Sequence, residues 1–234
     1  MKKYAKEKLL VGLVFATLLV STIFVIIAII IAPTVADDAD LSTRVKGDYV
    51  LMLLQCISGV FAMMLPGMLK KRINLEIPSN MLILYAIFLY CAIYLGEVRL
   101  FYYNVPHWDT ILHTFSGAML GALGFSFISF LNKTDSVHID LSPLFIAVFT
   151  LCFAVTLGVV WEIYEFTIDT IFRTNMQKFA LENGEPLLGS EALLDTMKDL
   201  IVDTVGAIVM SVVGYISLKH KKGWLEKLQL KLSK

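Results

Sequence analysis

Six long apolar runs alternate with short polar stretches along the whole chain. Each run has about the 20 residues that a helix needs to cross a hydrocarbon core roughly 30 Å thick. Only a helix is plausible for such a run, because lipid cannot satisfy exposed backbone groups. The pattern therefore predicts an all-α polytopic membrane protein with about six transmembrane helices in one bundle, a single membrane domain over residues 1–234. The expected spans are residues 9–32, 49–69, 80–97, 108–131, 143–168 and 195–218.

Composition agrees with this pattern and excludes some classes of protein. Hydrophobic residues make up 57% of the chain and charged residues 17%, which is outside the range of ordinary soluble domains. A net charge of zero gives no indication of nucleic-acid binding. The three cysteines lie inside apolar runs without metal-ligand spacing, so we expect packing residues and no disulfide framework. The first run exceeds the 7–15 apolar residues of a secretory signal, which favours a retained anchor.

Lysine and arginine are unevenly distributed between alternate connections. Fourteen of the 20 lie in the N-terminal segment, in the second and fourth connections and in the C-terminal tail. The positive-inside rule then predicts that both termini are cytoplasmic.

Two polar segments are predicted to do more than connect spans. Residues 171–194 place Phe172, Met176 and Phe179 at helical spacing, which predicts a short interfacial helix and turn over the outer ends of the last spans. Residues 219–234 alternate lysines with Trp224 and leucines, which predicts an amphipathic cytoplasmic tail helix on the inner leaflet.

Ionisable residues recur in pairs at the predicted outer ends of spans four, five and six. Charged side chains at membrane depth cost about 2.5–3.5 kcal/mol each on insertion scales, so several at one level require an explanation. Within each pair the residues are three or four apart and share a helical face. We therefore predict one polar site among these helices. The pairs are Asp109 and His113, Glu162 and Glu165, and Asp195 and Asp199.

The helical rise of 1.5 Å per residue ranks these side chains by depth. We predict that the inner ligand set of this site consists of His113, Glu162, Glu165 and Asp199. These four side chains can reach the same depth from helical faces that point toward one another. Asp109 and Asp195 are expected as supporting residues nearer the helix ends, and Asp203 as a supporting residue one turn deeper. Plainer interpretations are that Asp109 caps a helix and that the two glutamates lie in an aromatic interfacial belt.

So many carboxylates cannot all be ionised side by side in a low dielectric. The only basic residues that we expect nearby are Arg99 and Lys198. A divalent metal cation held by His113 and carboxylates would relieve the repulsion. Protonation would also relieve it, and it is the chemistry of proton-coupled transport. The sequence leaves both open, and no residue in it identifies a catalytic nucleophile.

Small residues indicate which helices approach closely. Gly117, Gly121 and Gly124 recur on span four, and Gly206 with Ala207 lies on span six. Such spacing lets helix backbones come together, so spans four and six are predicted to touch.

Three segments carry a family resemblance over roughly residues 80–218. WDTILHTFSGAMLG, WEIYEF and LLDTMKDLIVDTVGA resemble, in order and placement, the signatures of the bacterial YjdF-like inner-membrane family. A looser similarity to VanZ-like proteins rests on Asp203-Thr204-Val205-Gly206-Ala207. Trp108 and Trp161 replace the family's usual tyrosines, and Asp203 stands where its pattern is apolar. The residues that match the family's motifs are Asp109, His113, Gly117, Glu162, Glu165, Asp195, Thr196, Asp199, Gly206 and Ala207.

The resemblance implies a multi-pass protein of the bacterial cytoplasmic membrane with a shared site, but no reaction. The leading hypothesis is an outward-facing acidic and histidine site that binds a divalent cation and acts on, or senses, an envelope lipid or lipid-linked precursor. One alternative is a small proton- or cation-coupled transporter. Another is a structural or accessory membrane protein whose polar residues hold helices together.

Overall fold

The computed structural model describes residues 2–34, 44–133, 141–181 and 185–232. Six of its helical segments are long and apolar enough to cross a membrane, which confirms the predicted all-α polytopic fold. The helices that form them are α1 (Lys2–Ile31), α2 (Lys46–Ile73), α3 (Ser79–Leu89) with the π-helix η1 (Tyr90–Val98), α5 (Trp108–Lys133), α6 (Pro143–Phe172) and α7 (Ser190–Lys219).

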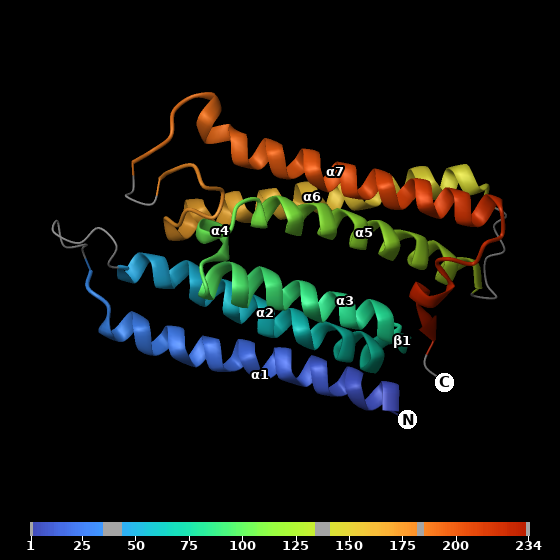
Figure 1. Ribbon diagram of the computed structural model, residues 1–234, viewed down its shortest axis with the longest axis horizontal. Helices are drawn as coiled ribbons and strands as arrows, with labels where there is room; N and C mark the ends of the chain where they lie inside the picture. The colour runs from blue at the N-terminus through green and yellow to red at the C-terminus, as the bar shows by residue number, and fades with distance from the viewer. Residues whose placement is uncertain (1, 35–43, 134–140, 182–184, 233–234) are drawn as a thin grey trace.

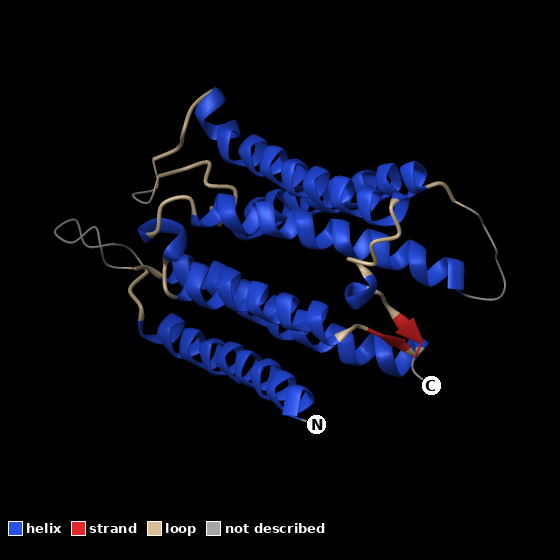
Figure 2. Cartoon of the chain, turned by 45° about the vertical axis from the view of Figure 1, so that its right-hand side comes forward, coloured by secondary structure: helices blue, strands red, loops and turns tan. Residues whose placement is uncertain are grey.

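The spans form two groups that lie side by side (Figures 1 and 2). Helices α1, α2, α3 and η1 share one apolar core, in which Leu18, Met52 and Ala86 are fully buried. Helices α5, α6 and α7 form the second group, which brings together the three spans predicted to share a polar site. Both chain ends lie at the same end of the molecule, as an even number of spans requires. The cytoplasmic assignment of that end stays a prediction.

Helix α2 contains a proline in its interior, and helix α3 compensates for it. Pro66 has no N–H to donate to the carbonyl of Ala62, one turn earlier. The hydroxyl of Tyr85 on α3 donates to that carbonyl oxygen at 2.9 Å. A buried carbonyl without a partner would be costly in lipid, so this bond stabilises α2 and attaches α3 to it.

Glycine allows the close contact between α5 and α7. A Cβ at Gly206 would collide with the backbone carbonyl of Thr114 on α5, and one at Gly117 with that of Asp203 on α7. Gly121 is less tightly enclosed, since its added Cβ would meet the Met210 side chain at 3.0 Å. The predicted contact between spans four and six is therefore confirmed, and it is tightest at Gly117 and Gly206.

The predicted interfacial helix within residues 171–194 is wrong. Helix α6 continues to Phe172 and stops at Arg173, whose φ of 56° is left-handed. The chain then returns as an irregular loop that carries a bridge between Ala180 and Pro186, and α7 already begins at Ser190. The carboxylate of Asp169 accepts hydrogen bonds from the Thr174 hydroxyl (2.6 Å) and from the backbone N–H groups of Met176 (2.7 Å) and Gln177 (2.9 Å). These bonds satisfy backbone groups that a helix would otherwise pair.

The predicted amphipathic tail helix is also wrong. Beyond α7 the described residues, which end at position 232, form only a three-residue 3₁₀ turn, η2 (Glu226–Leu228), and the strand β2 (Lys231–Leu232). Strand β2 pairs antiparallel with β1 (Leu75–Glu76), which follows α2 (Figure 2). The hydroxyl of Ser126 on α5 donates to the Leu228 carbonyl (2.8 Å) and accepts from the Leu230 N–H (2.6 Å). The tail thus gains hydrogen bonds to both helix groups that a separate surface helix could not make.

Candidate functional site

His113 lies at the centre of the polar side chains, near the start of α5. Its Nδ1 is 3.2 Å from Oδ2 of Asp203 on α7. The hydroxyl of Ser116, on the next turn of α5, donates to the other oxygen of Asp203 at 2.6 Å. In the tautomer that carries its hydrogen on Nδ1, the ring donates that hydrogen to Asp203. Asp203 thereby fixes the orientation of the imidazole ring.

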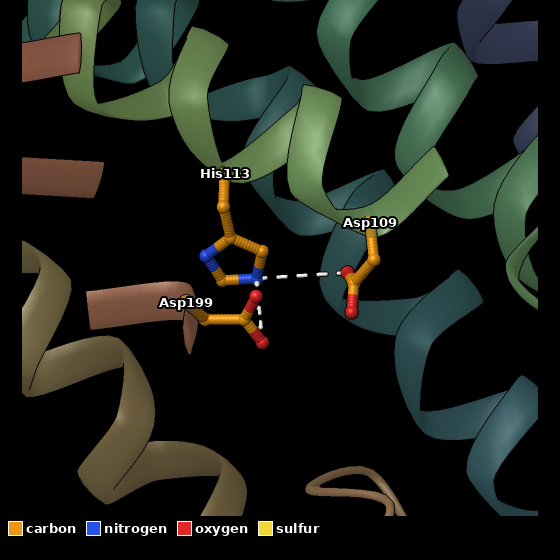
Figure 3. Close-up of side chains that lie close together, drawn as sticks. All are labelled: Asp109, His113 and Asp199. Atoms are coloured by element: carbon orange, nitrogen blue, oxygen red, sulfur yellow. Dashed lines mark ion pairs between the residues drawn. The ribbon is translucent and has the colours of Figure 1, made fainter. Parts of the chain in front are cut away.

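The other ring nitrogen faces two further carboxylates (Figure 3). Nε2 of His113 is 3.7 Å from Oδ1 of Asp109 and 3.8 Å from Oδ2 of Asp199. Ligand atoms of these three residues all lie within 4.8 Å of one another. Asp199 is 2% exposed, and its Oδ1 has no partner among the described residues. A neutral imidazole would direct its Nε2 lone pair toward two carboxylates, so a proton or a metal cation is needed between them.

The two glutamates are close by but outside this group. Oε1 of Glu165 accepts a hydrogen bond from Nε1 of Trp161 at 2.8 Å. Glu162 is 5% exposed, and neither of its carboxyl oxygens has a partner among the described residues. The structure therefore places Asp109, rather than either glutamate, with His113 and Asp199. Asp203 contacts the histidine directly, although its depth had suggested a more distant role.

Lys178 is the site residue that sequence reasoning missed. Its ammonium group pairs with Asp109 and lies 3.6 Å from Oδ1 of Asp195 and 5.3 Å from the centre of the Tyr102 ring. Burial by itself lowers the pKa of Lys178, but Asp109 and Asp195 more than offset this, and the pKa is raised. The expected basic neighbours were Arg99 and Lys198, whereas the cation at the site comes from the loop after α6.

The position of Lys178 follows from the way in which Asp169 holds that loop. Asp169 is 6% exposed and accepts three hydrogen bonds from residues 174–177. The carboxyl terminus of α6 and the loop are thereby fixed together. Lys178 has a left-handed φ of 48°. The sequence did indicate a role for Asp169, because it lies on the same helical face as Glu162 and Glu165. Two of its three partners are backbone N–H groups of the following loop, which a sequence pattern does not reveal.

A cavity of about 390 Å³ connects this site with the apolar interior between the two helix groups. Its polar end contains Asp109, His113, Glu165, Lys178 and Asp199. Tyr102 also lines it, and burial together with the negative charges of Asp109 and Glu97 raises the pKa of its phenol. The apolar part is lined by α2, α3, η1, α5 and α6, at Leu51, Ala62, Tyr85, Phe88, Leu89, Ala92, Ile93, Leu112, Met119, Leu120 and Leu157.

The ligand types at His113 suit a divalent cation. Two donors each about 2.1 Å from one tetrahedral ion are about 3.4 Å apart, close to the separations of 3.7 and 3.8 Å found here. Metal-binding histidines commonly donate their other ring N–H to a carboxylate that does not bind the metal and that orients the ring. Asp203 is placed for this role at Nδ1 of His113. Three protein ligands leave coordination positions free for another molecule.

Comparisons with known proteins agree with the fold. An uncharacterized protein of Thermotoga maritima is 30% identical over 151 residues, which cover 64% of this chain and 69% of that protein. No solved structure matches the chain. The YjdF-like resemblance is compatible with these findings, whereas they give no support to the VanZ-like one. Residues 13–220 match the family described as "Predicted membrane protein (DUF2238)", and the chain belongs to this family.

Proposed function

We propose that this membrane protein binds one divalent metal cation through Asp109, His113 and Asp199. The observation that carries the proposal is the environment of the imidazole ring: Asp203 occupies Nδ1, and Nε2 faces two carboxylates at 3.7 and 3.8 Å. Histidine with carboxylate ligands suits Zn²⁺, Mn²⁺ or Fe²⁺ better than Ca²⁺, which takes oxygen ligands.

In this proposal the metal cation lets the protein act on, or sense, an envelope lipid or lipid-linked precursor in the bacterial cytoplasmic membrane. Support comes from the cavity, which joins the charged residues to an apolar interior. An amphiphile could place its head beside the cation and its chain among apolar side chains. The cation would act as a Lewis acid on the head group, or hold that head group for recognition.

The proposal predicts metal binding that depends on His113. Protein purified in detergent, stripped with a chelator and then dialysed against Zn²⁺ or Mn²⁺ should retain about one ion per chain by elemental analysis. His113→Gln and Asp199→Asn should lose that ion. Asp203→Asn should weaken binding by about 10- to 100-fold, because it removes the group that orients the ligand.

His107→Gln is the matched control, since His107 is exposed in the loop just before α5. It should bind metal as the wild type does. Each variant must also elute as a monodisperse peak with wild-type thermal stability, so that loss of metal is not loss of fold. A wild type that retains no ion after dialysis, or a His113→Gln variant that retains a full one, would refute the proposal.

A second function, proton- or cation-coupled transport, is favoured by Glu162. Its carboxyl group is buried in α6 with both oxygens unpartnered among the described residues. Reconstituted in vesicles, a transporter should move protons or a cation, and Glu162→Gln should abolish that movement while leaving metal content intact. Vesicles with no flux and a Glu162→Gln variant of unchanged phenotype would exclude this second function.

A further inference from the structure

The contacts of Lys178 identify the chemistry of the cavity's polar end. An alkylammonium group is held there by two carboxylates, Asp109 and Asp195, and by the face of the Tyr102 ring. Carboxylates and an aromatic ring together are the partners by which proteins recognise organic ammonium ions. The side chain of Lys178 is 29% exposed, so it reaches this position from the aqueous end.

Charge at the cavity wall also favours a cationic ligand. Lys178 and His113 are the basic residues among those described that line it. Six carboxyl groups line it as well, at Glu97, Asp109, Glu165, Asp195, Asp199 and Asp203. A phosphate or sulfate head would face this acidic wall, whereas an ammonium head would find several partners.

The apolar part of the cavity has the depth of one membrane leaflet. Leu51 and Ala62 both line it, with Gln55 as the one polar lining residue between them, and they lie eleven residues apart on α2, about 16 Å along the helix axis. That is roughly half of a 30 Å hydrocarbon core. The volume of about 390 Å³ is within the range of ligand pockets, which begins near 300 Å³. It suits one hydrocarbon chain rather than a whole diacyl lipid.

We propose that the cavity binds a single-chain amphiphile with an alkylammonium head. The chain lies between α2, α3 and α5, and the head takes the place of the Lys178 ammonium between Asp109 and Asp195, with Lys178 displaced toward water. This inference goes beyond metal binding and does not depend on it, although a metal and the ammonium would both use Asp109.

Binding of radiolabelled dodecylammonium to protein in phosphatidylcholine nanodiscs tests the inference, with empty nanodiscs to correct for partitioning. Wild type should show saturable binding that dodecyltrimethylammonium competes for and dodecyl sulfate does not. Lys178→Gln should bind about tenfold more tightly, since a competing charge near a protein surface is removed. Asp195→Asn should bind about tenfold more weakly for the same reason.

Matched controls separate the site from the general charge of the protein. Lys198→Gln and Glu191→Gln make the same charge changes on α7 at residues that do not line the cavity, and they should leave affinity unchanged. A gain of affinity in Lys178→Gln cannot arise from misfolding. Equal binding of dodecyl sulfate, or the same affinity in wild type, Lys178→Gln and Asp195→Asn, would overturn the inference.

Two further binding measurements identify the source of the amine and distinguish this inference from the metal-binding proposal. If the amine belongs to a lipid head group, single-chain lysophosphatidylethanolamine in the nanodisc should compete with dodecylammonium; if it is a free amine, that lipid should have no effect. Removing metal with a chelator should leave dodecylammonium binding intact or strengthen it, because both ligands would use Asp109. Amine binding in a protein that retains no metal would therefore sink the metal proposal alone, and the reverse result would sink this one alone.

Discussion

Replacing Gly206 with alanine tests whether the contact between α5 and α7 builds the site. The added methyl group would collide with the carbonyl oxygen of Thr114. That atom belongs to the backbone, so no rotamer change can relieve the overlap. Ordinary carbon–oxygen contacts are about 3.3–3.6 Å, which means that the helices have to separate by about 1 Å.

The expected loss of stability has two parts. Overpacking costs about 1–3 kcal/mol. Separation of the helices by about 1 Å also takes Nδ1 of His113, now 3.2 Å from Asp203, beyond hydrogen-bonding distance. A lost hydrogen bond adds about 0.5–1.5 kcal/mol. The sum of about 1.5–4.5 kcal/mol corresponds to a fall in Tm of roughly 3–18 °C for a chain of this size.

The fall in Tm is measured by heating samples of the detergent-solubilised protein and using size-exclusion chromatography to determine the folded fraction at each temperature. Gly12→Ala is the control, because an added Cβ there meets nothing within 4 Å. Alanine is also the better helix former by up to about 1 kcal/mol, so that variant should be unchanged or slightly more stable. Equal Tm values for Gly206→Ala and Gly12→Ala would refute the claim that the close contact between α5 and α7 stabilises the fold. A Gly206→Ala variant with a lowered Tm that still binds one metal ion per chain would refute the claim that this contact builds the site.

Three further predictions concern the loop, the tail and the orientation. Asp169→Asn should make the loop after α6 more sensitive to protease, because three hydrogen bonds lose their charged acceptor; an unchanged digestion rate would contradict this. Ser126→Ala should speed hydrogen exchange at Leu230, whose N–H loses its acceptor, and equal exchange in both proteins would count against a docked tail. A cysteine at the exposed position Asn104 should react with an impermeant thiol reagent in intact cells, and one at Asn74 should not. The opposite labelling would reverse the predicted orientation.

The sequence was sufficient for the six spans, though not for the loop after α6 or for the tail, because a membrane imposes strong and local constraints on a spanning segment. Each apolar run must be helical and must have the length of the bilayer, so spans could be assigned without knowledge of their neighbours. The same constraint made the polar pairs conspicuous, since few charged residues occur at membrane depth. Glycine spacing then predicted that α5 and α7 meet.

Only the tertiary structure decided which polar residues share the site and what holds them. The helical rise gives the depth of a residue along its own helix, but not the rotation and shift between two helices. Packing at Gly117 and Gly206 sets these, and it brings Asp203 to His113 and Asp109 near Asp199 while Glu162 stays apart. Lys178 could not be found from periodicity, because it lies in an irregular loop held by backbone hydrogen bonds to Asp169. Periodicity describes residues within one helix, whereas this site depends on contacts between helices and on a loop without a repeat.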